Sequence, residues 1–182
     1  MRKVIPIFIG LALLGIALSV AFPLFQAKKS GPGQFSALGG LLTLKAPPAW
    51  KEMDSLNPVA NLKVGDEVAD AYLIVVSEKK SEVKGDTHSV ENYSKFVRGH
   101  LRGTLKNGRE RGPWWVTVGS RRALRYEVLG TSQDGLDLVY LHTTVETPEY
   151  FHQIVGWTQA KDYPKNRSAL RQISDSLREG GE

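Results

Sequence analysis

The sequence predicts an α+β domain in which an antiparallel β-sheet lies between helical layers, preceded by one N-terminal hydrophobic helix. Residues 122–158 contain three β-prone runs separated by two turn signals, Ser132–Gly135 and Thr147–Glu149, a pattern typical of an antiparallel meander. Two other segments carry apolar residues at helical spacing. Strands in succession with helices that must cover both sheet faces indicate a three-layer α/β/α sandwich.

The middle strand of the meander, Leu136–Val145, is apolar on both of its alternating faces, as the neighbours Tyr140 and Leu141 illustrate. A strand with water on one side would alternate apolar with polar residues, so this strand is expected to be covered on both sides. We therefore predict that Tyr140, Ile154 and Trp157 are buried.

The first predicted helix runs from Val90 to about Leu105, with Ser89 as its N-cap. We expect one face to point inward and the other to point to water. The inward residues are Val90, Tyr93, Phe96, Val97, Leu101 and Leu105, and the outward ones are Glu91, Lys95, Arg98 and Arg102. A second helix opens at Tyr163-Pro164, where proline suits the first turn. Its inward stripe is Leu170, Ile173 and Leu177.

The remaining segments are shorter. We predict strands at Leu41–Leu44, Ala71–Ser77 and Trp114–Val118, and a core position for Trp50. We predict irregular structure or loops where proline, glycine and charged residues accumulate. These segments are Asn57–Glu67, Glu78–Thr87 and Asn107–Pro113.

The N-terminal run Val4–Ala27 has 24 residues and no ionisable side chain. As a helix it would span about 36 Å, against about 30 Å of bilayer hydrocarbon. It predicts either a retained signal anchor or a signal peptide cleaved after Ser19-Val20-Ala21. The anchor is favoured because the apolar character continues through Phe25. Both alternatives place the folded domain outside the cytoplasm, membrane-anchored in the first case and secreted in the second.

The chain therefore divides into three parts. We predict the anchor or signal peptide over residues 1–27, a flexible linker rich in glycine, serine and proline over 28–40, and the folded domain over 41–182.

Cysteine is absent, which excludes disulfides, thiolate zinc sites, catalytic thiols and a lipid-modified N-terminal cysteine. Sequence motifs for serine hydrolases, zinc proteases and nucleotide-binding loops are also absent. We accordingly expect no enzymatic activity and no cofactor.

Residues 42–177 resemble the PsbP-like family, whose bacterial members include DcrB-type periplasmic proteins and lipoproteins. The resemblance covers core positions along nearly the whole domain, and it contains no catalytic motif. The matching stretches are Pro47–Trp50, the helix after Ser89, Gly119–Leu124 with Tyr126, Val139-Tyr140, Phe151–Thr158 and the closing helix before Ser176-Leu177. The resemblance implies an antiparallel sheet between helical layers and a non-enzymatic role, because family members typically bind or stabilise larger partners.

Two histidines form the most site-like pair. If the second hairpin is centred on Thr147, His142 and His152 face each other across it, close enough to share a metal ion. Two imidazoles alone do not complete a metal site, so buried, hydrogen-bonded histidines are the favoured interpretation. A small hydrolase or metal-binding protein using His142 and His152 is the alternative function.

The strongest compositional signal is basic. Residues 98–125 contain eight basic side chains and one acidic side chain, a net charge of +7, whereas the whole chain carries +5. We expect a positive surface beside Trp114-Trp115, formed by Arg98, Arg102, Arg109, Arg111 and Arg121. An extracytoplasmic location argues against nucleic acid. The expected partners are an acidic protein or anionic lipid, and a merely solvated face is the alternative.

Together these observations predict a membrane-tethered, extracytoplasmic accessory protein. It would attach to the membrane through Val4–Ala27 and dock on a larger partner or membrane complex.

Overall fold

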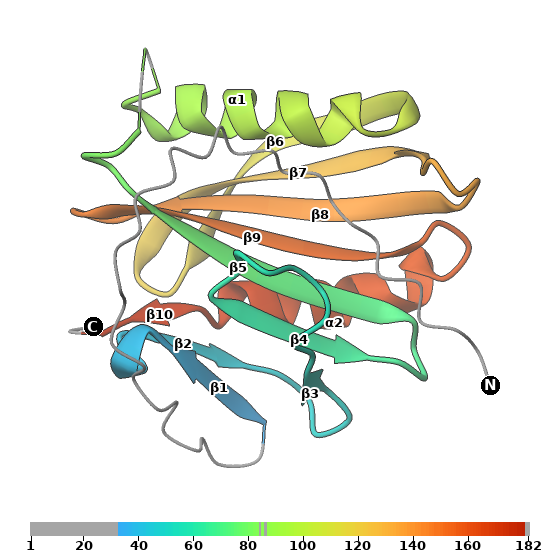
Figure 1. Cartoon of the computed structure of the whole chain (residues 1–182), viewed down its shortest axis with the longest axis horizontal. Helices are drawn as coiled ribbons and strands as arrows, with labels where there is room; N and C mark the ends of the chain where they lie inside the picture. Colours follow the sequence, from blue (N-terminus) through green and yellow to red (C-terminus); the bar gives the residue numbers. More distant parts are fainter. Residues whose placement is uncertain (1–32, 84, 86, 181–182) are drawn as a thin grey trace.

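The computed structural model describes residues 33–83, 85 and 87–180 (Figure 1). The predicted N-terminal helix, Val4–Ala27, lies outside these residues. Among the described residues, no helix is long and apolar enough to cross a membrane.

The main sheet has seven strands in the order β3-β4-β5-β9-β8-β7-β6, and every neighbouring pair is antiparallel. The strands are β3 (Lys51–Glu52), β4 (Leu62–Asp66), β5 (Ala71–Lys79), β6 (Lys106–Val118), β7 (Arg121–Thr131), β8 (Asp137–Glu146) and β9 (Tyr150–Gln159). The predicted meander is confirmed as β7, β8 and β9. The strand β5, which comes earlier in the chain than the meander, pairs with β9 along nine residues and extends the sheet beyond it.

Helix α1 (Val90–Gly103) covers one face of the sheet and helix α2 (Tyr163–Asp175) covers the other. Two residues on opposite faces of β8 show this arrangement. Leu141 packs in a core with Leu170 of α2, whereas Leu138 packs in a core with Leu101 of α1. We call these the α2 face and the α1 face. The predicted sheet between helices is confirmed.

A second, three-stranded sheet lies beside α2, at the margin of the molecule opposite α1 (Figure 1). Its order is β1-β2-β10, formed by Gln34–Ala37, Leu42–Lys45 and Arg178–Glu179, and a 3₁₀ turn at Leu38–Gly40 joins β1 to β2. Residues 34–40, predicted as linker, are thus part of the folded domain. The strand β10 pairs with β2 at Arg178 and Glu179, and Gly180 then donates a backbone hydrogen bond to Leu41. A strand of two residues has no sequence pattern by which it could be predicted.

The predicted burial of the meander is confirmed. Tyr140, Ile154 and Trp157 are 2%, 0% and 2% exposed. Trp50, predicted as a core residue, is 5% exposed.

Helix α1 begins as predicted, since the Ser89 hydroxyl accepts a hydrogen bond from the Asn92 amide. Two of its side-chain assignments are wrong. Phe96 is 50% exposed, and Arg98 is 7% exposed. Residues advance about 100° around a helix, which places Arg98 about 80° from Val90 and Phe96 about 120° away on the other side. The buried stripe is centred on the side nearer Arg98.

Two segments predicted as irregular are strands. Within Asn57–Glu67, Leu62–Asp66 forms β4 because it pairs with β5 along five residues. The predicted basic loop Asn107–Pro113 lies inside β6. Its turn-forming residues are accommodated by two register shifts against β7, one between Lys106 and Arg109 and one between Arg111 and Trp114.

Candidate functional site

The α2 face carries a buried carboxylate surrounded by arginines. Glu127 of β7 is 3% exposed and accepts a hydrogen bond of 2.7 Å from the Tyr163 hydroxyl. Arg167 Nε and Arg171 Nη2 lie 3.5 Å from Glu127 Oε1, and Arg111 Nη1 lies 3.7 Å from Oε2. We call these five residues the Glu127 cluster. It is assembled from β6, β7 and α2.

The local geometry of each element explains the cluster. Arg111 and Glu127 are register partners in neighbouring strands, so their side chains leave the sheet on the same face. Tyr163, Arg167 and Arg171 are spaced four residues apart in α2 and therefore lie along one side of the helix. The cluster forms where that side of α2 faces β7.

The cluster has an excess of positive charge. Three guanidinium groups surround one carboxylate, which leaves a net charge of +2. The side chains of Arg111, Arg167 and Arg171 are 66%, 47% and 35% exposed, so all three reach solvent. A guanidinium has five N–H donors in a planar fork, and Glu127 engages one nitrogen of each arginine. The remaining donors suit a carboxylate or phosphate from outside.

Tyr163 holds the buried end of the cluster. Burial is the main cause that raises the pKa of its phenol, and the hydrogen bond to Glu127 raises the pKa further. The phenol therefore stays protonated and donates to Glu127 at physiological pH.

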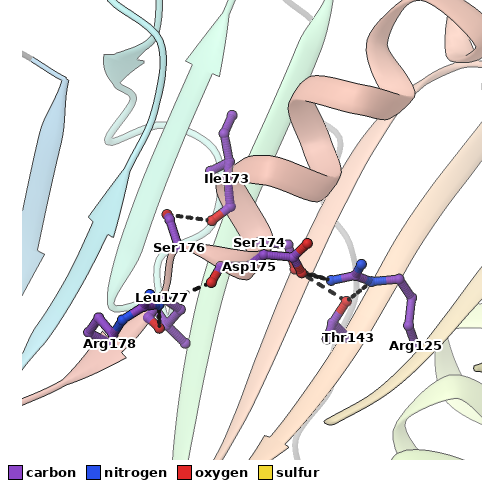
Figure 2. Close-up of polar contacts among 8 residues, drawn as sticks. All are labelled: Arg125, Thr143, Ile173, Ser174, Asp175, Ser176, Leu177 and Arg178. Atoms are coloured by element: carbon purple, nitrogen blue, oxygen red, sulfur yellow. Dashed lines mark hydrogen bonds and ion pairs between the residues drawn. The ribbon is translucent and has the colours of Figure 1, made fainter. Parts of the chain in front are cut away.

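Arg125 lies two residues from Glu127 on the same strand and the same face, but its charge is neutralised. Its guanidinium pairs with Asp175 and donates to Thr143 Oγ1 at 2.9 Å and to Ser174 Oγ at 3.3 Å (Figure 2). Arg125 is 4% exposed. These contacts fasten the last turn of α2 to β7 and β8, so we assign Arg125 a structural role.

The five arginines predicted to form one surface are divided among three places. Arg98 and Arg102 of α1 both pair with Glu110 on the α1 face, and the Arg98 guanidinium also lies 3.5 Å from the centre of the Tyr126 ring. Arg109 and Arg111 lie on the α2 face, opposite Leu129 and Glu127. Arg121 is half-buried at the start of β7.

The predicted single surface is therefore replaced by a different one. The Glu127 cluster keeps Arg111, with the exposed Arg109 two residues away, and adds Arg167 and Arg171 from α2. Sequence reasoning missed these two arginines. Tyr163, Arg167 and Arg171 follow one another at intervals of four residues, which predicts that they share one side of a helix. Only the fold places that side of the helix beside β6.

The two tryptophans lie on opposite faces of β6. Trp114 is 39% exposed on the α2 face, where its register partner is Arg125. Trp115 is 46% exposed on the α1 face, and the Arg122 guanidinium lies 4.2 Å from the centre of its ring. Two large aromatic side chains are thus available to solvent next to basic residues.

The predicted pairing of His142 with His152 is wrong. Glu146 pairs with Phe151, so the hairpin is centred between Pro148 and Glu149. His142 consequently lies opposite Val155, three residues beyond His152. Because successive strand residues alternate between faces, this odd displacement places the two imidazoles on opposite faces of the sheet. The described part of the chain contains no group of three or more histidine and acidic side chains that could hold a metal ion.

His152 makes other contacts that the sequence did not suggest. Its Nδ1 lies 2.8 Å from the Ser77 hydroxyl, the register partner in β5, and its Nε2 lies 3.9 Å from Glu179 Oε1 in β10. Burial, as the main cause, lowers the pKa of His152, although Glu179 opposes this shift. A serine, a histidine and a glutamate are the residue types of acyl-transfer enzymes. Here the imidazole is 1% exposed and connects three strands.

No known protein family matches the sequence, and no curated protein matches it. Several solved structures match the fold. LpqN of Mycobacterium tuberculosis, described as involved in cell envelope biogenesis, aligns with a TM-score of 0.58 and 14% identity over 75% of this chain and 82% of its own. The cyanobacterial PsbP protein (CyanoP) of Synechocystis aligns with a TM-score of 0.53 and 13% identity over 85% of this chain and 98% of its own.

A protein of Bacteroides thetaiotaomicron aligns with a TM-score of 0.55 and 10% identity, over 82% of this chain and 50% of its own. At these identities the comparisons establish the fold alone. The chain has a PsbP-like fold, as the resemblance in the sequence predicted.

Proposed function

We propose that this chain is a non-enzymatic accessory protein of the cell envelope that docks on an acidic partner protein through the Glu127 cluster and Arg109. The observation that carries the proposal is the convergence of three solvent-reaching arginines on one buried carboxylate. The carboxylate holds the guanidinium groups in place, and their remaining N–H groups are available to bind carboxylates of a partner. The fold shared with LpqN, itself involved in cell envelope biogenesis, supports an envelope role.

The proposal includes the membrane attachment predicted from Val4–Ala27. A tether would confine the domain to the membrane surface and raise its local concentration near membrane-bound partners. The basic surface then selects among them by charge.

The test removes two cluster charges and keeps the fold. Reversal of Arg111 to glutamate would place a second carboxylate beside Glu127, so glutamine is the better replacement. We expect Arg111→Gln/Arg167→Gln to reduce recovery of the partner from solubilised membranes. The matched control is Lys51→Gln/Lys79→Gln, which removes the same charge from two exposed lysines of β3 and β5.

Binding should also weaken as salt rises, since exposed charges are screened over about 8 Å at physiological ionic strength. Co-sedimentation with anionic and neutral vesicles is measured in parallel. Equal binding by both double variants, at low and high salt, would contradict the proposal. Selective loss of vesicle binding, with partner recovery intact, would assign the surface to anionic lipid.

The contact between Ser77, His152 and Glu179 is the one observation that favours the alternative function, a small hydrolase. A nucleophilic serine would react with a fluorophosphonate probe. Labelling of the wild-type chain that disappears in Ser77→Ala would support a hydrolase. Absence of labelling agrees with a structural contact between β5, β9 and β10.

A further inference from the structure

The strand β6 is at the end of the strand order, so within the described residues it pairs with β7 on one side and with no strand on the other. An unpaired strand edge exposes backbone N–H and C=O groups to solvent and can accept a strand from another chain. Proteins commonly prevent such pairing with charged residues, proline and bulges.

The two halves of β6 differ in this respect. The half from Lys106 to Pro113 contains four charged residues, a proline and both register shifts. The half from Trp114 to Val118 contains no charged residue and pairs with β7 without interruption. The first half is protected against strand addition, and the second half is not.

The side chains of the second half also favour a partner strand. Trp114 and Trp115 are 39% and 46% exposed on opposite faces of β6, so an added strand would contact an aromatic ring on each of its own faces. Tryptophan is enriched among the residues that dominate binding energies at interfaces.

The charges at both ends of this edge define the partner. Arg111 precedes Trp114, and Arg121 and Arg122 follow the turn after Val118. A second copy of the chain, pairing antiparallel through the same edge, would place the Arg111 end of one copy against the Arg121–Arg122 end of the other. This arrangement brings positive charges together. An extended segment with carboxylate side chains is complementary to the same edge.

We propose that Trp114–Val118 binds an extended acidic segment of a partner protein by strand addition to the edge of β6. This inference rests on the proposed function and specifies how the acidic partner is held. Backbone hydrogen bonds would fix the segment, the tryptophans would grip its two faces, and Arg111 and Arg122 would attract its carboxylates.

The test uses the purified full-length chain in detergent and three synthetic octapeptides with blocked ends. The first alternates valine and glutamate, the second has the same sequence with every backbone nitrogen methylated, and the third alternates valine and lysine. The methylated peptide keeps its charges and side chains but donates no backbone hydrogen bond. We expect only the first peptide to bind, and we expect it to slow amide hydrogen exchange within residues 114–118.

The double variant Trp114→Ala/Trp115→Ala should weaken binding of the first peptide by about tenfold or more, the loss typical of removed aromatic anchors. Phe96→Ala is the matched control, because it removes an aromatic side chain that is 50% exposed but belongs to α1 and not to β6. Circular dichroism of each variant confirms that the fold is retained.

The outcomes separate this inference from the proposed function. If the methylated peptide binds as well as the first, or if the first does not bind, strand addition is overturned, and recovery of the acidic partner decides the proposed function separately. Equal binding of the lysine peptide would overturn the acidic specificity. Self-association of the chain that the tryptophan variant abolishes would assign the edge to a second copy.

Discussion

His142 is a buried ionisable group on the α1 face. It is 1% exposed, and neither ring nitrogen has a hydrogen-bond partner among the described residues. Burial, with a smaller contribution from Arg98, lowers its pKa from 6.5 to about 3. The folded protein therefore holds His142 neutral at physiological pH.

This pKa predicts a pH-dependent stability. Below about pH 6.5 the unfolded chain binds a proton at His142 that the folded chain does not bind, so the free energy of unfolding falls as pH decreases from 6.5 towards 3. The contribution of one such group is at most about 1.4 kcal/mol per pH unit. We expect His142→Gln to lose less stability than the wild type across this window, measured by urea unfolding at a series of pH values.

His152 also has a lowered pKa, but it is present in both proteins, so the difference between the two curves isolates His142. Parallel curves for wild type and variant would show that His142 is not held neutral in the fold.

Glu127 and Arg125 show how neighbouring residues acquire different roles. Both are buried, and both lie on the α2 face of β7. Arg125 meets one acid, Asp175, and its charge is neutralised there, whereas Glu127 meets three arginines and leaves an excess of positive charge. The charge that each residue contributes to the proposed docking surface therefore depends on its neighbours more than on its residue type.

At the scale of the elements, α1 is held by a cap at its N-terminus and by packing of its inner face. The Ser89 hydroxyl accepts a hydrogen bond of 3.2 Å from the Asn92 amide, and Tyr93 stacks on Phe151 of β9 with ring centroids 4.4 Å apart. The cap satisfies a backbone donor that would otherwise lack a partner.

Loss of this cap should destabilise the domain. We expect Ser89→Ala to lower the free energy of unfolding by about 1 kcal/mol, the usual cost of a lost N-cap. Ser89→Asp should retain most of the stability because aspartate also caps helices. Ser81→Ala, in the exposed loop before the helix, is the control in a denaturant titration. A cost as small as that of Ser81→Ala would mean that packing alone fixes the start of α1.

The strand β6 is the element that combines both proposals. Its first half contributes Arg109 and Arg111 to the basic surface, and its second half contributes the unprotected edge. The register shift between Arg111 and Trp114 separates the two halves. A partner could therefore contact the cluster with its side chains and the edge with its backbone.

The whole molecule is a three-layer sandwich with a small accessory sheet (Figure 1). The proposed docking surface lies on the α2 face, and the proposed binding edge belongs to β6. The N-terminal apolar run is expected to bring this sandwich to a membrane. This expectation rests on the sequence of Val4–Ala27, which precedes the described residues.

The full-length chain should sediment with membranes and resist extraction at alkaline pH, because a helix of this length and composition would stay in the bilayer. Immunoblots of fractions before and after alkaline washing measure this. Release by the wash would contradict a retained anchor. N-terminal sequencing distinguishes the alternative, since a mature terminus at Phe22 would identify a cleaved signal peptide.

The sequence by itself determined the local features of this protein. The meander, both helices of the described domain, the Ser89 cap and the buried Trp157 could be predicted, since each depends on periodicity or turn chemistry within a few residues. The same reasoning was wrong for β4 and for the first half of β6, because pairing with β5 and β7 overrides their irregular local pattern.

Only the tertiary structure decided the sites. A hairpin centred between Pro148 and Glu149 separated His142 from His152, because an odd change of register moves a side chain to the opposite face. The packing of α2 against the main sheet brought Arg167 and Arg171 to Glu127, forty residues or more away along the chain. Charge counting along the sequence found the basic stretch, but the distribution of those charges depends on contacts between residues that the sequence keeps far apart.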